Sequence, residues 1–136
     1  MLAQAFLTAA DLAITEPQRA ALMKVLVLLE TGKLKHVAAV GDNDERAKFS
    51  GNFNMANWKG EHSCGTVACI GGTAELIGRV RFAPIFSMKE KELKELFCPT
   101  EIHAWEKITT SQAATALRSY LTTGDARWDL ATAGSV

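Results

Sequence analysis

The clearest pattern along the chain is a run of apolar residues at helical spacing after Thr15. Its apolar positions lie three or four residues apart, on one face of a helix: Leu22, Val25, Leu26 and Leu29. Thr15 and Gln18 have the spacing of a capping box, and Gly32 follows the last apolar position as a typical stop signal. The pattern therefore predicts a helix over residues 16–31.

A second segment carries the same start and stop signals. Thr109 and Gln112 repeat the capping-box spacing, and Gly124 follows a helical run that reaches about Thr122. Both segments read Ile-Thr-x-x-Gln-x-Ala at the start and Thr-Gly at the end. The residues between the two segments do not match, so we interpret the likeness as reuse of a good cap and a good stop rather than as a duplication.

Weaker patterns predict the remaining helices. Residues 2–13 are apolar and rich in alanine, which favours a helix. Ser87 and Glu90 form another capping box, from which a helix runs to about Phe97. Residues 66–78 are apolar on almost every side, which is typical of a helix enclosed by its neighbours. This last segment is predicted to be the centre of the fold.

The predicted fold class is all-α, a compact bundle of about five helices around the buried helix at about 66–78. Residues 37–62 lack a helical period, and their turn residues and bulky apolar side chains leave room for one short β-hairpin. The length suits a single domain, predicted over residues 1–130, with a disordered tail at 131–136.

Composition and charge narrow the classes of partner. Of the 136 residues, 48% are hydrophobic, and 15 basic side chains balance 15 acidic ones. A neutral chain has no strong field to attract nucleic acid, and no apolar run is long enough to cross a bilayer, so neither is predicted as a partner. Three cysteines are too few for a disulfide framework, which predicts reduced thiols and a cytoplasmic location.

Reactive residue types are concentrated in residues 62–72. Cys64 lies at the start of the predicted central helix, where the helix dipole favours a thiolate, and His62 or His103 could act as a base. No orienting Asn or Asp can be identified beside them. No catalytic residue is therefore assigned: Cys64, His62 and His103 are candidates, and a partly buried structural thiol is the competing interpretation.

The same segment offers His62, Cys64 and Cys69 as weak zinc-ligand candidates. In one helix, Cys64 and Cys69 would lie about 140° apart around the axis, so they could not converge on one ion. The usual Cys-x₂-Cys spacing is also absent. We therefore predict no metal and no cofactor, and we interpret Cys69 as a small apolar core residue.

Several motifs resemble those of a family of small uncharacterised bacterial and phage proteins. They are Phe53-Asn-Met55-x-x-Trp58, Cys64-Gly-Thr-x-Ala-Cys69-Ile-x-Gly72, Leu96-Phe97-x-Pro99, Ile108-Thr-x-x-Gln112-Ala and Thr123-Gly-x-x-x-Trp128. The resemblance covers about residues 50–129 and implies one domain of bacterial or phage origin, with no activity attached. Thr73 departs from the pattern, because the resemblance implies a large aromatic residue or His after Gly72.

Two functions follow as alternatives. The preferred one is a small non-enzymatic helical module for protein interaction or self-association, because the chain is neutral and its motif residues are mostly core types. The other is a cysteine-dependent hydrolase or transferase that uses Cys64 with a histidine, so an enzymatic activity is left open. A zinc-stabilised fold is a minor third hypothesis.

Overall fold

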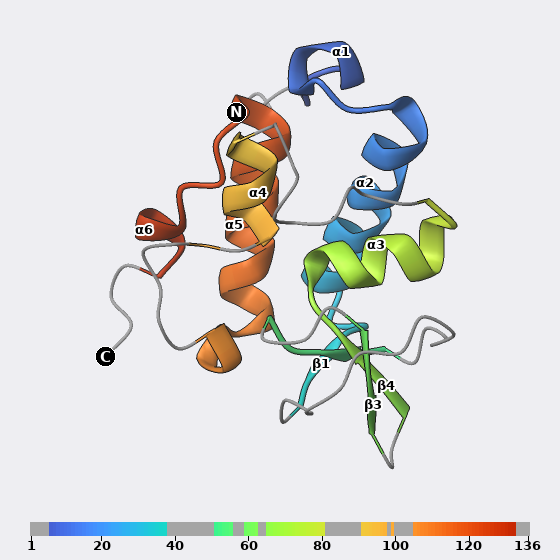
Figure 1. Ribbon diagram of the computed structural model, residues 1–136. Helices are drawn as coiled ribbons and strands as arrows, with labels where there is room; N and C mark the ends of the chain where they lie inside the picture. The colour runs from blue at the N-terminus through green and yellow to red at the C-terminus, as the bar shows by residue number, and fades with distance from the viewer. Residues whose placement is uncertain are drawn as a thin grey trace.

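The computed structural model describes residues 6–37, 51–55, 59–62, 65–80, 91–97, 99 and 105–132. Its architecture is mainly helical, as predicted, with a small β element below the helices (Figure 1). The helices of these residues are, in chain order, α1 (Ala9–Leu12), α2 (Glu16–Glu30), α3 (Ile70–Gly78), α4 (Lys91–Phe97), the 3-10 helix η2 (Trp105–Lys107), α5 (Thr110–Thr123) and α6 (Trp128–Ala131).

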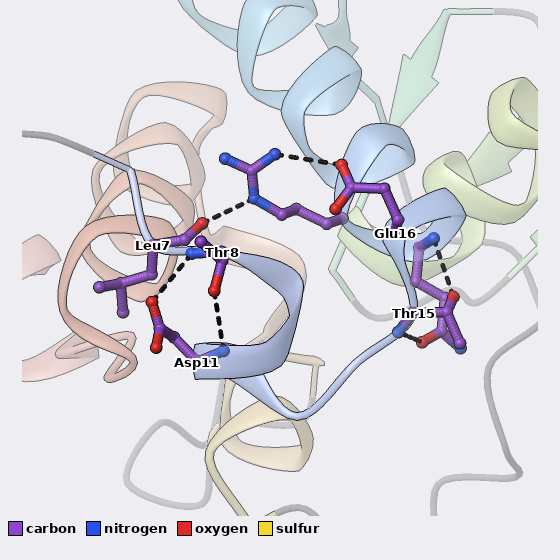
Figure 2. Close-up of polar contacts among 7 residues, drawn as sticks. Leu7, Thr8, Asp11, Thr15 and Glu16 are labelled. Carbon is purple, nitrogen blue, oxygen red and sulfur yellow. Dashed lines mark hydrogen bonds and ion pairs between the residues drawn. The ribbon is translucent and has the colours of Figure 1, made fainter.

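The two long helices begin at the predicted capping boxes. At α2, the Thr15 hydroxyl accepts from the Gln18 N–H (3.2 Å), and the Gln18 side chain accepts from the Thr15 N–H (2.9 Å) (Figure 2). At α5, Thr109 and Gln112 make the same reciprocal pair at 3.1 and 3.0 Å. Gly124 then ends α5 with a φ of 84°, a left-handed conformation that glycine adopts without strain.

The helix predicted at residues 2–13 is wrong in its extent, because α1 covers only Ala9–Leu12. Thr8 and Asp11 form a third capping box, which starts the helix at Ala9, and Ala13 ends it with a left-handed φ of 58° (Figure 2). Residues 1–5 lie outside the described residues. Side-chain hydrogen bonds to the backbone, rather than apolar density, therefore decide where α1 begins.

Within the described ranges, the β element consists of four short strands: β1 (Lys35–His36), β2 (Asn52–Phe53), β3 (Lys59–His62) and β4 (Gly65–Ala68). Their order in the sheet is β1-β2-β4-β3. β1, β2 and β4 run parallel, whereas β3 and β4 form an antiparallel hairpin in which His62 pairs with Gly65. The hairpin therefore extends past residue 62, beyond the stretch in which it was expected.

The predicted start of the central helix at residue 66 is wrong. Residues 65–68 form β4, and α3 begins only at Ile70, with Cys69 as its N-cap. Thr66 and Val67 are β-branched residues that suit a strand, and a short apolar run cannot be assigned to helix or strand from its periodicity. Pairing with β2 on one side and β3 on the other gives these four residues their strand conformation.

The core lies between α2, α3 and α5; α4 and α6 both pack against α5, and α6 lies on the side of α5 away from α2 (Figure 1). α2 packs against both α3 and α5, and its predicted apolar face is buried. α3 is buried from Ile70 to Ala74, whereas residues 75–78 are half-buried. None of the helices in the described ranges has the length and apolar character needed to cross a membrane.

The C-terminal part of the chain packs back onto the bundle. Residues 81–90 lie outside the description, so only the end of the helix predicted from Ser87 is placed, as α4. Trp128 in α6 is buried, and its indole N–H donates to the Glu95 carbonyl of α4 (2.9 Å). The tail predicted from residue 131 begins too early, because Ala131 is the last residue of α6. Residues 133–136 lie outside the described part.

Candidate functional site

The cysteine at the start of α3 is Cys69. It is the N-cap residue, and its sulfur accepts from the Gly72 N–H at 3.5 Å. The side chain is only 2% exposed and belongs to the hydrophobic core, and its thiol is free of any disulfide. The prediction that Cys69 is a small core residue is confirmed. The thiol at the N-terminus of α3 is therefore buried away from solvent.

The proposed catalytic set is not brought together in the described residues. Cys64 and His103 lie outside them, and His62 is placed only by its backbone, as the last residue of β3. The premise that placed Cys64 at a helix N-terminus is wrong, since α3 begins at Ile70. A cysteine-dependent hydrolase or transferase at Cys64, with a histidine as base, stays a prediction.

The zinc hypothesis gains no ligand set from the geometry. Among the residues whose placement is given, no group of three His, Cys, Asp or Glu side chains could hold a metal ion. Of the weak candidates His62, Cys64 and Cys69, only Cys69 has a described side chain, and that sulfur caps α3.

Two polar side chains are buried near the junction of sheet and helix. Asn54, 1% exposed, follows β2, and its amide donates to the Val37 carbonyl after β1 (2.7 Å). Thr73 in α3 is fully buried, and its hydroxyl oxygen has no hydrogen-bond partner among the residues that the structure describes. Thr73 is also the position at which the sequence resemblance predicts a large aromatic residue or His.

Thr73→Val is expected to raise the free energy of unfolding by about 1 kcal/mol, because valine has the same shape and removes a desolvated, unpaired hydroxyl. Thr122→Val is the matched control. Thr122 is also buried in a helix, but its hydroxyl donates to the Arg118 carbonyl at 2.8 Å. The free energy of unfolding of Thr122→Val should therefore be about 1 kcal/mol lower than that of wild type. Urea unfolding measures both; a loss of stability in Thr73→Val contradicts the interpretation.

A second candidate site is a hollow between α2 and α5. It lies where the end of α2 meets the start of α5, and its volume is about 530 Å³. The hollow is open to solvent, and its walls mix polar and apolar side chains. The lining residues are Leu29, Glu30, Gly32, Thr110, Ser111, Ala114, Thr115 and Arg118.

One ion pair crosses this hollow from helix to helix. The Arg118 guanidinium donates twice to the Glu30 carboxylate, at 2.7 and 2.6 Å. The same guanidinium lies over the Phe6 ring, 5.4 Å from its centroid. The hydrogen bonds from Arg118 lower the pKa of Glu30, and the same bonds raise the pKa of Arg118. A charge on each of two helices is thereby held at a fixed position.

The stabilisation from this pair should disappear in acid. Because the pKa of Glu30 is lowered in the folded state, its contribution is fully present above the ordinary glutamate value of about 4.3 and is lost as the pH falls through the folded value. At pH 7 the free energy of unfolding of wild type should exceed that of Glu30→Gln by less than about 1 kcal/mol, because the ion pair is half-exposed.

Urea unfolding at pH 7 and at successively lower pH measures this difference. Asp129, whose pKa is lowered by hydrogen bonds from Arg127, titrates in both proteins and cancels. Arg118→Gln is the control and should remove the same part of the pH dependence. If the difference in free energy of unfolding between wild type and Glu30→Gln is the same at pH 7 and in strong acid, the ion pair does not stabilise the fold.

Next to the ion pair, α2 presents a stripe of residues on its outer side. We call Glu16, Arg19, Met23, Val27 and Glu30 the α2 stripe, since three or four residues separate each from the next. Val27 is 57% exposed, and Met23 is partly buried. In the described residues, one other large apolar side chain is as exposed, Leu130 at 59%, and it lies in α6 on the other side of α5 (Figure 1).

An ion pair also lies at the first turn of the stripe. Arg19 contacts the Glu16 carboxylate at 3.3 Å, and its Nε donates to the Leu7 carbonyl at 2.6 Å (Figure 2). The stripe therefore begins and ends with paired charges and carries Met23 and Val27 between them. Sequence reasoning missed it, although Met23 and Val27 already lay off the buried face of the predicted helix.

No protein-family model, curated protein or solved structure matches the chain. The resemblance to the bacterial and phage family therefore stays a prediction, and the geometry of the molecule itself carries the functional argument.

Proposed function

We propose that this chain is a non-enzymatic helical module for protein interaction or self-association, and that it binds through the α2 stripe. The observation that carries the proposal is Val27, a large apolar side chain left 57% exposed near the C-terminal end of the 15-residue helix α2. A lone exposed valine needs no explanation. Its place between Met23 and a fixed ion pair gives it the surroundings of a binding surface.

The side chains around Val27 support this surface in particular. Methionine, aromatic residues and arginine are enriched in protein interfaces. Here Met23 lies one helical turn before Val27, and Arg118 binds Glu30 and lies over the Phe6 ring. Arg118 is held by Glu30 and by the Phe6 ring, so little side-chain entropy remains to be lost on binding. Prior ordering of this kind favours a stable complex.

The partner is proposed to be a protein, either the same chain or another. Equal numbers of acidic and basic side chains over the whole chain support this over nucleic acid. The buried thiol of Cys69, which forms no disulfide, supports a reducing, cytoplasmic location. Family origin in bacteria or phages is part of the same proposal and rests on the sequence motifs.

The experiment compares two matched variants. Val27→Glu and Leu130→Glu each place a charge at an equally exposed apolar position, the first on the stripe and the second on α6. Each tagged protein is incubated with an extract of cells that carry the chain, and captured proteins are identified and then tested again as purified pairs. Binding should be lost in Val27→Glu and kept in Leu130→Glu. Equal binding by both variants would overturn the proposal for this surface.

A further inference from the structure

The α2 stripe is complementary to its own reversed copy. Glu16 pairs with Arg19 of its own chain, and from Arg19 onward the stripe presents a base, two apolar side chains and an acid: Arg19, Met23, Val27 and Glu30. An antiparallel second helix presents the same order backwards. The acid of each copy then faces the base of the other, and the two apolar residues face each other in the middle.

The spacing of these residues suits such a pairing. If Met23 of one copy lies opposite Val27 of the other, Glu30 comes within one residue of the level of Arg19, an offset of about 1.5 Å. In this register residues 20–30 of each α2 lie against the same residues of the other, so the paired helices would run alongside each other for about 16 Å. A parallel arrangement would instead set Glu30 against Glu30 and Arg19 against Arg19, which like-charge repulsion disfavours.

We propose that the occupant of the α2 stripe is a second copy of this chain, bound antiparallel across a two-fold axis near Met23 and Val27. This inference rests on the proposed function and names its partner. Glu30 of each copy faces Arg19 of the other, while Val27 of each packs on the other's Met23. Such a contact is isologous, as expected for a closed homodimer, and the neutral chain adds no net repulsion between copies.

The remaining charge beside the stripe leaves this pairing intact. Lys24 is exposed and lies about 60° around α2 from Val27, at the solvent edge of the contact. There it stays hydrated, and salt screens it from its copy. Arg118 keeps its intrachain bonds to Glu30, so the Glu30 carboxylate stays in place for Arg19 of the second copy.

The test uses the purified full chain. Sedimentation equilibrium over a range of concentrations should show a dimer for wild type, and the dissociation constant should rise about tenfold or more in Val27→Glu, because each dimer buries two such charges. Leu130→Glu should dimerise like wild type. Dimers that Val27→Glu leaves unchanged would overturn the inference.

A complementary pair of charge reversals tests whether the charges at positions 19 and 30 meet across the contact. Arg19→Glu alone and Glu30→Arg alone should each be mainly monomeric, because like charges then face each other twice. Mixed in equal amounts, they should form a heterodimer in which both facing pairs are again opposite in sign. Circular dichroism and thermal melting confirm that each variant is folded; a mixture no more dimeric than its components overturns the antiparallel register.

The outcomes separate this inference from the proposed function. A wild-type chain that is monomeric at every concentration overturns the second copy as occupant. If Val27→Glu nevertheless abolishes capture of a different protein and Leu130→Glu does not, the stripe remains an interaction surface for another partner. If neither variant alters any binding, both proposals fail together.

Discussion

Trp128→Ala should lower the free energy of unfolding by about 3–5 kcal/mol, the range for removing a buried large aromatic side chain. Trp128 is 4% exposed, and its indole N–H donates to the Glu95 carbonyl, so the ring connects α6 to α4. The variant leaves a cavity and a carbonyl without this donor. Urea unfolding of wild type and variant at equal protein concentration measures the difference.

Trp128→Phe is the control that separates packing from hydrogen bonding. It keeps most of the apolar contact and removes the indole donor, so a loss of about 1–2 kcal/mol is expected. The two values should therefore differ clearly. A loss below 1 kcal/mol in Trp128→Ala would mean that α6 does not pack against the bundle in solution.

Gly78→Ala should cost about 1–3 kcal/mol, although alanine is the better helix former by about 1 kcal/mol. Gly78 ends α3 where that helix crosses α2. A Cβ atom added at Gly78 would lie 2.4 Å from the Ala21 Cβ and 3.3 Å from the Ala21 Cα, against about 3.5–4.0 Å for carbon atoms in favourable contact. One of the two helices must therefore move.

The reciprocal exchange gives this prediction its control. Ala21→Gly removes the methyl group that blocks the new side chain, so Ala21→Gly combined with Gly78→Ala should be more stable than the sum of the single variants implies. Thermal melting of wild type, the two single variants and the double variant measures this double-mutant cycle. Additive effects, or a Gly78→Ala variant as stable as wild type, would show that the crossing is looser than described.

The helix boundaries that could be predicted are those defined by local hydrogen bonds. Thr15 with Gln18, and Thr109 with Gln112, each satisfy backbone N–H groups within one turn, so their sequence spacing suffices to locate a helix start. Gly124 likewise ends α5 through its own left-handed conformation. Such signals are complete within four residues and depend little on the rest of the fold.

The start of α3 could not be predicted in this way. Residues 65–68 carry no charge and would suit a buried helix or a buried strand equally well. Their conformation follows from pairing with β2, which lies more than ten residues earlier in the chain, and with β3. The same error placed Cys64 rather than Cys69 at a helix N-terminus, so the cysteine hypotheses rested on an element that begins four residues later.

The α2 stripe could be predicted from the sequence only in part. The sequence placed Met23 and Val27 off the buried face of a helix, but it could not say whether another helix would cover them. Nor could the ion pair between Glu30 and Arg118 be predicted, because 88 residues separate the two side chains. Only the packing of α5 beside α2 brings them within hydrogen-bonding distance.

The chain thus determined by itself the positions of its long helices, their caps and their apolar faces, because these depend on neighbours within a few residues. The tertiary structure decided three further features: the strand at 65–68, the burial of Cys69 and Thr73, and the exposure of Val27 beside a fixed ion pair. Each of these depends on which distant segments lie against it, and contacts of that kind are set by the packing of the whole core rather than by local spacing.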